Sequence, residues 1–309
     1  MKYKPRSPYF YVGDKYKLMP QIAQLFPKRI RRYYEPFVGG GSSALYIDAD
    51  EYHLNDIDAY IIKLHRFIGG FTNKRQELLD NLFVLIDEYK MTLSFKGVTV
   101  GDELKKKYVK TYFAHYNRPG FLRMREDFNA DKGDMLRLYV LLIYGFNHFL
   151  RFNSKGDFNL PVGNVDFNKN VYNALTGYLQ FVRNNNVKFY CGDYKLFLQN
   201  AEIGKGDFVY LDPPYLISAS EYNKGWSTTE ETDLLTVLDE LNECGVRFAI
   251  SNLITHKNRE NTIFSEWSAK YHTDEIMSNY ISYHDNSVKN SREVLVRNYG
   301  LSRTEAKFD

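Results

Sequence analysis

Only two cysteines, Cys191 and Cys244, occur among the 309 residues. Two thiols cannot form a disulfide framework and are too few for a structural zinc site, so we predict no metal site. No apolar run approaches the roughly 20 residues that span a membrane. The basic start of the chain is not followed by the apolar segment of a signal peptide. We therefore expect a cytoplasmic protein with no membrane partner.

Two common nucleotide-binding motifs are also absent. The sequence contains no Gly-x-x-x-x-Gly-Lys-Ser/Thr loop for a triphosphate and no Gly-x-Gly-x-x-Gly fingerprint of a dinucleotide site. It shows no internal repeat or heptad run. A hydrophobic content of 44% with 26% charged residues is typical of a soluble globular protein. The length fits one large domain with an insertion, or two domains.

Positive charge is concentrated at the start of the chain. Nine Lys or Arg residues and a single acid, Asp14, precede Glu35, and aromatic residues make up 16% of the chain. Basic side chains interleaved with aromatic rings are typical of surfaces that bind nucleic acid. A solvated basic face is an equally open interpretation of the charge alone.

Short apolar strands alternate with helical stretches. A tight glycine loop and a helix at 44–47 follow the first strand, and another helix is predicted at 230–243. Strands are predicted at 32–35, 52–56, 187–190, 208–211, 248–250 and 293–296. This alternation implies an α/β fold with a mostly parallel sheet. We expect Asp56, Asp193 and Asp212 at the carboxyl edge of that sheet, where ligands of such folds bind.

The interval from residue 62 to 186 breaks the alternation. Helices are predicted at 76–89, 102–116 and 135–144, with a charged aromatic loop before the last of them. Residues 151–161 predict a basic β-hairpin around a Ser-Lys-Gly-Asp turn. We therefore predict two domains, one formed by 1–61 with 187–309 and an inserted one formed by 62–186.

The tetrapeptide Asp212-Pro213-Pro214-Tyr215 directly follows the apolar strand at 208–211. The two prolines make the loop rigid and keep it out of the sheet. Asp212 and the Pro213 carbonyl supply two acceptors and Tyr215 supplies a flat apolar face, which suits a planar ring carrying an exocyclic amine. The alternative is an Asp-Pro turn followed by a core tyrosine.

A glycine loop, Glu35-Pro36-Phe37-Val38-Gly39-Gly40-Gly41-Ser42, follows the first strand. Glycines allow positive φ and close approach of a ligand to the backbone. Asp56 ends the next strand, seventeen residues after Gly39, where an acid is placed to accept the hydroxyls of a ribose. A helix-entry turn is the alternative for the glycines, and a helix cap near Ala59 is the alternative for Asp56. Phe37 fits a core position as well as a cofactor contact.

Together these features resemble S-adenosylmethionine-dependent DNA adenine-N6 methyltransferases of the Dam-like class, and they occur in the order of that class. Residues 11–18 are similar to the family's Trp-Ala-Gly-Gly-Lys-Tyr segment, with Tyr11 in place of Trp and Asp14 in place of Gly. The added carboxylate of Asp14 leaves the cofactor contact at that position open. The hairpin from Arg151 resembles the family's Arg-Tyr-Asn…Gly-Glu-Phe-Asn-Val-Pro-Phe-Gly.

The resemblance implies a Rossmann-like methyltransferase domain with an inserted, mainly helical target-recognition domain. S-adenosylmethionine is the implied cofactor and double-stranded DNA the implied partner. The implied cofactor-binding residues are Tyr11, Lys15, Phe37, Gly39, Gly41, Asp56, Asp193 and Asp212. The implied catalytic residues are Asp212, Pro213, Pro214 and Tyr215, and the implied DNA-binding residues are Asn147, Arg151, Asn153, Lys155 and Pro161. The family's basic residue three positions after that proline is Asn164 here, so GATC recognition is not assumed.

The implied reaction is direct transfer of a methyl group to the N6 amine of a flipped adenine, without a covalent enzyme intermediate. Because Tyr215 would stack on that base, Tyr215→Ala is expected to lose more activity than Tyr215→Phe or Tyr215→Trp. Three alternatives stay open: a cytosine-N4 methyltransferase, a catalytically silent DNA-binding protein and a nicotinamide-dependent oxidoreductase. We expect a monomer, with or without a separately encoded restriction endonuclease as partner.

Overall fold

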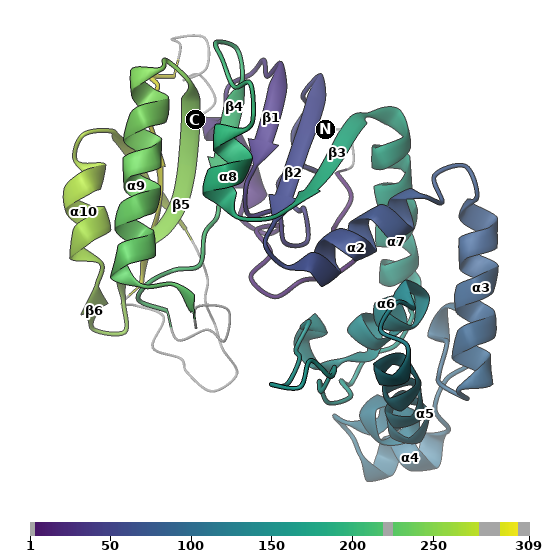
Figure 1. Ribbon diagram of the computed structural model, residues 1–309. Helices are drawn as coiled ribbons and strands as arrows, with labels where there is room; N and C mark the ends of the chain where they lie inside the picture. The colour runs from purple at the N-terminus through teal and green to yellow at the C-terminus, as the bar shows by residue number, and fades with distance from the viewer. Residues whose placement is uncertain (1–3, 219–224, 278–290, 302–309) are drawn as a thin grey trace. The chain divides into compact units, whose positions relative to one another are not determined.

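The structure is a computed structural model that describes residues 4–218, 225–277 and 291–301 (Figure 1). The chain forms two compact units. Residues up to 14, 39–45 and 58–189 form the first, which we call the helical unit, and residues 15–38, 46–57 and from 190 onward form the second, the sheet unit. The assignment of a catalytic domain and a DNA target-recognition domain to residue ranges stays a prediction.

The sheet runs in the order β3-β2-β1-β4-β5-β8-β7, and β6 pairs with β5. The pairs β1–β2, β1–β4 and β4–β5 are parallel, whereas β8 is antiparallel to both β5 and β7. The predicted mostly parallel α/β sheet is therefore confirmed. The strands are β1 (Arg32–Glu35), β2 (Glu51–Asp56), β3 (Asn186–Cys191), β4 (Phe208–Leu211), β5 (Arg247–His256), β6 (Arg259–Glu260), β7 (His272–Ile276) and β8 (Arg292–Arg297).

The strand order reverses between β1 and β4. From β1 the chain adds β2 and β3 on one side, and it later adds β4 and β5 on the other. In open α/β sheets ligands bind beyond the carboxyl ends of the strands at such a reversal. The two loops that leave the sheet at this place begin with Pro36 after β1 and with Asp212 after β4.

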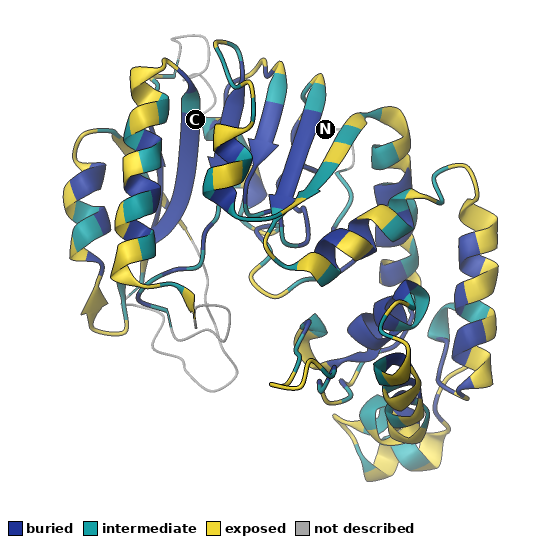
Figure 2. Cartoon of the chain, in the orientation of Figure 1, coloured by how far each residue is buried: buried dark blue, intermediate teal, exposed yellow. Residues whose placement is uncertain are grey.

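The helices that cover the sheet turn a buried side toward it, because its central strands are buried on both faces. All four residues of β4 are completely buried, and Figure 2 shows β1, β4 and β5 buried along most of their length. Helices α9 (Thr228–Glu243) and α10 (Thr262–Ser268) pack against β5 (Figure 1). The buried residues of α9 recur at helical spacing, Glu231, Leu234, Leu235 and Leu238, and a Ser227–Glu230 capping box starts the helix. The sheet unit also contains α1 (Met19–Ile22), η1 (Ala23–Leu25) and α8 (Tyr194–Gln199).

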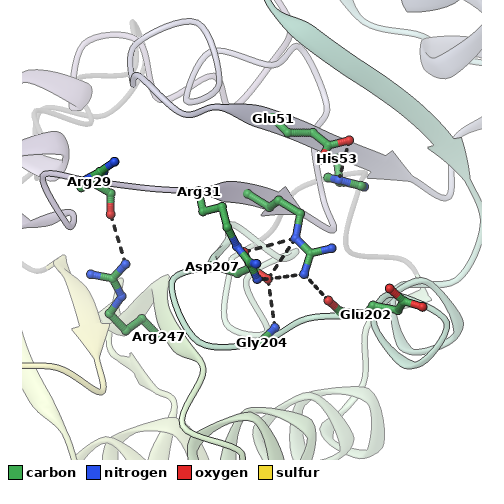
Figure 3. Close-up of polar contacts among 9 residues, drawn as sticks. Arg29, Arg31, Glu51, His53, Glu202, Gly204, Asp207 and Arg247 are labelled. Carbon is green, nitrogen blue, oxygen red and sulfur yellow. Dashed lines mark hydrogen bonds and ion pairs between the residues drawn. The ribbon is translucent and has the colours of Figure 1, made fainter.

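An ionic cluster closes the amino-terminal edge of the sheet (Figure 3). Asp207, which directly precedes β4, has a fully buried side chain that accepts hydrogen bonds from the guanidinium groups of Arg31 and Arg32 at 2.8–3.2 Å. The backbone N–H of Gly204 donates to the same carboxylate at 2.9 Å. The cluster joins the start of β1 to the start of β4.

The helical unit is built around α6 (Met135–Tyr144), in which eight of the ten residues are buried. Its sequence Met-Leu-Arg-Leu-Tyr-Val-Leu-Leu-Ile-Tyr is apolar on nearly all sides, as expected for a helix surrounded by others. The other helices are α2 (Ala59–Gly69), α3 (Arg75–Glu88), α4 (Asp102–Lys107), α5 (Tyr112–Ala130), α7 (Lys169–Asn184), η2 (Ser94–Lys96) and η3 (Phe146–His148). No helix among the described residues is both long and apolar enough to cross a bilayer.

The charged aromatic loop predicted before α6 is wrong. Residues 112–130 form one helix, α5, which runs through Pro119. Asn117, Phe121, Met124 and Phe128 are its buried residues, spaced four, three and four apart on one helical face. Burial of this stripe outweighs the cost of a proline in a helix. The predicted helix at 102–116 is in turn divided, because α4 ends at Lys107 and α5 begins at Tyr112.

The helix predicted at 44–47 is also wrong, because residues 42–46 form turns. One helix-like hydrogen bond is present there, from the N–H of Leu45 to the carbonyl of Gly41 at 3.2 Å. Fixing a first helical turn costs more than one hydrogen bond returns. Asp48, Ala49 and Asp50 then lead into β2, so the stretch is too short to recover that cost.

Candidate active site

The Asp212–Tyr215 loop leaves the sheet at the carboxyl end of β4. Tyr215 is 9% exposed and packs against Ile217 and Leu253. Its hydroxyl lies 2.9 Å from Asp212 Oδ1 and 3.0 Å from Oε1 of Glu293 on β8. The prolines between Asp212 and Tyr215 hold the loop so that both side chains turn to the same place.

Lys15 lies at the centre of this group. Its ammonium is 2.9 Å from Asp212 Oδ1, 3.7 Å from Glu293 Oε1 and 4.9 Å from the centre of the Tyr215 ring. The Lys15 side chain is 9% exposed, so its charge is offset by carboxylates rather than by bulk water. The structure therefore brings two of the predicted residues, Lys15 and Asp212, into direct contact.

The two acids at the ends of β4 differ in their electrostatics. Burial raises the pKa of Asp212, Lys15 opposes this and Glu293 adds to it. Burial also acts to raise the pKa of Asp207, but the hydrogen bonds from Arg32 and Arg31 bring it below its ordinary value. The ionised form of Asp207 is thus stabilised, as suits a structural group. The ionised form of Asp212 is instead destabilised by burial, which is common at reactive sites.

Three further predicted residues lie together at the carboxyl ends of β1, β2 and β3. Asn55 is buried, and its side-chain amide donates to the carbonyls of Pro36 at 3.1 Å and Gly192 at 3.0 Å. The N–H of Gly192 donates in turn to the carbonyl of Asp56 at 3.1 Å. These bonds hold together the loops that carry Phe37, Asp56 and Asp193, the residue after Gly192.

Phe37 lies in an aromatic group. Its ring centre is 5.2 Å from that of Tyr194 and 5.8 Å from that of Trp226. The indole N–H of Trp226 donates to the fully buried Glu231 at 2.7 Å, which fixes the orientation of the ring. Asp193 is the N-cap of α8 and accepts from the N–H groups of the second and third residues of that helix.

The glycine loop at 39–41 belongs to the helical unit and is approached by the start of the chain. Gly39 and Gly41 have positive φ, +44° and +74°. A Cβ on Gly40 would lie 2.9 Å from both Ser7 Oγ and Tyr11 Cβ, and the Ser7 hydroxyl donates to the Gly40 carbonyl at 2.6 Å. Close packing of protein on protein therefore explains Gly40.

His65 of α2, which follows the glycine loop in the chain, also hydrogen-bonds to this loop. Its Nε2–H donates to the carbonyl of Gly39 at 2.8 Å, which leaves Nδ1 to accept from the Tyr178 hydroxyl at 2.7 Å. The side chain is fully buried, and burial lowers the pKa of His65 to about 4. His65 is therefore neutral at physiological pH, in the one tautomer that serves both partners.

Asp58, not Asp56, caps helix α2. Asp58 Oδ1 accepts from the N–H groups of Tyr60 and Ile61, and the Tyr11 hydroxyl lies 3.5 Å from Oδ2. The alternative interpretation of Asp56 as the helix cap is therefore wrong, because Asp58 caps the helix two residues later. Asp56 is the last residue of β2. In the same unit Asp14 forms an ion pair with Arg6 at 3.4 Å, so its added charge is locally offset.

The predicted hairpin is present. Phe152 pairs with Phe158, and the N–H of Asn153 donates to the carbonyl of Asp157 at 2.9 Å. Asn153 Oδ1 accepts from the N–H groups of Lys155 and Asp157, which forms the turn. The guanidinium of Arg151 donates to the side chain and the carbonyl of Asn159, both at 2.9 Å, across the two arms.

Four of the predicted DNA-binding residues are exposed, Asn147, Asn153, Lys155 and Pro161, and Arg151 is half-buried. Asn147 has a positive φ of +55° in η3. Asn164, which stands where the family has a basic residue, accepts from the N–H groups of Phe113 and Ala114 at 2.9 and 3.2 Å. It therefore satisfies two donors of the first turn of α5.

Residues 11–280 match the model of one protein family, the D12 class N6 adenine-specific DNA methyltransferases. The chain belongs to this family. The family resemblance inferred from the glycine loop, Asp56, the hairpin and Asp212–Tyr215 is thereby confirmed. Asp212 lies beyond the reversal in strand order, where α/β enzymes bind their ligands.

Several curated relatives are similar to the chain. The type II methyltransferase M.FokI of Planomicrobium okeanokoites is 32% identical over 303 residues, which are 95% of this chain and 43% of the relative. Modification methylase StsI of Streptococcus sanguinis is 32% identical over 305 residues, with the same two shares. The DNA adenine methylase of Salmonella typhi is 28% identical over 260 residues, 81% of each chain. The chain spans less than half the length of the first two relatives.

The sequence patterns do not single out several residues of these sites, among them Asn55, Asp58, His65, Tyr194, Trp226 and Glu293. Asp58 stood one residue before the predicted start of α2 and fits the ordinary preference for an N-cap acid. Asn55 and His65 carried no motif, and Glu293 looked like the edge of a buried strand. Only the fold brings their side chains to the predicted residues.

Proposed function

We propose that this chain transfers a methyl group from S-adenosylmethionine to the N6 amine of an adenine in double-stranded DNA. One observation carries the proposal: Asp212, at the end of the central strand β4, has a raised pKa and contacts Lys15 and Tyr215 at the reversal in strand order. Membership of an adenine-specific methyltransferase family supports the same reaction.

The part of Asp212 in this reaction is to orient an amine. The lone pair of an aromatic amine is spread into its ring, so acceptors for both of its N–H groups favour a pyramidal, more nucleophilic nitrogen. Asp212 and the carbonyl of Pro213 would be those acceptors. Asp212 contacts Lys15 and Tyr215 through Oδ1, so its Oδ2 can meet the amine and later receive its proton.

The sheet unit holds a donor set that fits S-adenosylmethionine. The Asp56 carboxylate suits the ribose hydroxyls, and the aromatic group of Phe37, Tyr194 and Trp226 suits the adenine ring. When bound, the cofactor supplies a methyl group on a positively charged sulfur. The predicted cofactor contacts of Tyr11, Lys15, Asp193 and the glycines 39 and 41 are part of the same proposal.

We further propose that the helical unit meets the DNA. The hairpin presents Asn153, Lys155 and Pro161 to solvent, which suits contacts to phosphates and base edges. The internal bonds of Arg151 would keep the hairpin in shape before DNA arrives. The chain would act in the cytoplasm as a monomer, within a restriction–modification system whose endonuclease is encoded separately.

Methylation of adenine-unmethylated plasmid DNA with tritiated S-adenosylmethionine, followed by nucleoside analysis, tests the proposal. We expect N6-methyladenine as the product. Asp212→Ala should lower the transfer rate at least about 100-fold and leave DNA affinity unchanged. Asp80→Ala, an exposed acid on α3, is the control and should behave as wild type. N4-methylcytosine as the product, or near-normal transfer by Asp212→Ala, would overturn the assignment.

A further inference from the structure

Glu293 is a carboxylate placed inside an apolar strand. It lies in β8 opposite Leu253 of β5 and Ile276 of β7, and its side chain is 0% exposed. The next three residues, Val294, Leu295 and Val296, are also completely buried. A buried carboxylate is costly unless charged or hydrogen-bonding partners offset it. The partners of Glu293 therefore indicate what it does.

Those partners are the groups that surround Asp212. Glu293 Oε1 is 3.0 Å from the Tyr215 hydroxyl and 3.7 Å from the Lys15 ammonium. Asp212 Oδ1 is 2.9 Å from that same hydroxyl and 2.9 Å from that same ammonium. Two carboxylates thus share one ammonium and one hydroxyl. All four side chains belong to the sheet unit.

The shared hydroxyl imposes a constraint. A tyrosine has one hydroxyl proton, so Tyr215 can donate to Asp212 or to Glu293 but not fully to both. While Asp212 is a carboxylate, donation from Tyr215 stabilises it. When Asp212 receives a proton from the methylated amine, Tyr215 can turn its own proton to Glu293. Glu293 thereby offers the hydroxyl a second acceptor at 3.0 Å.

The charge of Glu293 also affects the pKa of Asp212. Burial is the largest influence that raises the pKa of Asp212, and the negative charge of Glu293 raises it further. Lys15 and the Tyr215 hydroxyl act in the opposite direction. Glu293 therefore makes Asp212 a better proton acceptor, while the hydroxyl makes it a poorer one.

We propose that Glu293 is a positioning residue for methyl transfer, which holds the Tyr215 hydroxyl and the Lys15 ammonium so that Asp212 keeps one orientation toward the amine. This inference rests on the proposed function. It gives the antiparallel strand β8 a part in the reaction, because β8 places the Glu293 side chain next to the loop that follows β4. It also assigns the Tyr215 hydroxyl a role that is separate from stacking by its ring.

The test is the pH dependence of the single-turnover rate constant, measured with the full chain, tritiated S-adenosylmethionine and adenine-unmethylated plasmid DNA. Glu293→Gln removes the charge and keeps the shape. We expect the rate constant to fall about 10–100-fold, with DNA and cofactor affinities close to wild type. The acid limb of the profile should move to lower pH, because the Glu293 charge that raises the pKa of Asp212 is gone.

Tyr215→Phe provides the opposite shift. It removes the hydroxyl that stabilises the Asp212 carboxylate and keeps the ring, so the acid limb should move to higher pH. In the double variant the rate constant should be no lower than in the worse single variant, because both changes act on one contact. Should Glu293→Gln fail to fold, Glu293→Asp replaces it, because it keeps the charge and shortens the side chain; an unchanged rate constant in that variant would overturn the role.

Glu275→Gln is the matched control. Glu275 lies on the neighbouring strand β7, is 63% exposed and pairs with Arg292, so the same change of charge there should leave rate and profile unaltered. An unmoved acid limb in Glu293→Gln, with active wild-type protein, would overturn the role of Glu293 only. Absence of methyl transfer by the wild-type chain would instead overturn the proposed function.

Discussion

Asp207→Asn should destabilise the sheet unit and leave the proposed methyl transfer unaffected. Asp207 is 0% exposed and takes hydrogen bonds from both Arg31 and Arg32 (Figure 3). The amide has nearly the same shape as the carboxylate, but it carries no charge and its nitrogen cannot accept. The variant therefore isolates the ionic part of the cluster.

The expected loss follows from the bonds that change. A hydrogen bond to a charged group contributes about 1.5–3 kcal/mol and one between neutral groups about 0.5–1.5 kcal/mol. The difference is about 1–1.5 kcal/mol for each arginine, so we expect a loss of about 2–3 kcal/mol in the free energy of unfolding. Larger values are not expected because the Arg31 and Arg32 side chains are 54% and 21% exposed and can be hydrated in the variant.

Urea unfolding followed by tryptophan fluorescence measures this loss. The chain has two tryptophans, Trp226 and Trp267, and both belong to the sheet unit. Glu275→Gln is the control, because its exposed ion pair with Arg292 should contribute no measurable stability. Equal midpoints for Asp207→Asn and Glu275→Gln would refute the reasoning.

The pH dependence provides a second check on the sign. The folded pKa of Asp207 is lowered, so its contribution is complete above the ordinary aspartate pKa of about 3.9 and is lost as the pH falls toward the folded value. The difference between wild type and Asp207→Asn should be constant from pH 5 to 8 and shrink below about pH 4. Methyl transfer should survive in the variant, since Asp207 and Asp212 are about 16 Å apart along β4.

Three further predictions concern Asp212, His65 and Gly120. Because burial raises the pKa of Asp212, methyl transfer should decline on the acid side at a higher pH than an ordinary aspartate of pKa about 3.9 would give. A single-turnover profile that stays flat down to that ordinary value would contradict this. Burial lowers the pKa of His65 to about 4, so the neutral side chain favours the folded state above pH 6.5, and roughly 3 kcal/mol of stability should be lost between pH 6.5 and 4. His65→Gln should reduce that loss in circular dichroism melts. An unchanged dependence of stability on pH in the variant would count against this prediction. A Cβ on Gly120 would lie 2.1 Å from the Tyr89 carbonyl oxygen, so Gly120→Ala should lower the free energy of unfolding by about 1–3 kcal/mol or more. Gly101→Ala is the control, because a Cβ there would have nothing within 4 Å, and it should shift the melting temperature little. Similar shifts for the two variants would refute the packing argument.

Local patterns were sufficient for many elements. The strands at Arg32–Glu35 and Phe208–Leu211 and the helix at Met135–Tyr144 have the predicted bounds. Acidic residues, a proline or a glycine stand directly next to these segments and limit how far each can extend. The helix through Pro119 was missed because a proline is a strong local signal. The stripe that overrides it stabilises the chain only when other helices cover it.

The sequence by itself determined the α/β class, the acids at the ends of the strands and the family, since motif spacing and alternation are properties of neighbouring residues. Only the tertiary structure decided which charges meet. Glu293 lies 78 residues after Tyr215 in the chain, and Lys15 lies almost two hundred residues before Asp212. Strand order and burial bring these groups within hydrogen-bonding distance and set the opposite pKa shifts of Asp207 and Asp212, because electrostatic energy depends on distance in space and on exclusion of water rather than on separation along the chain.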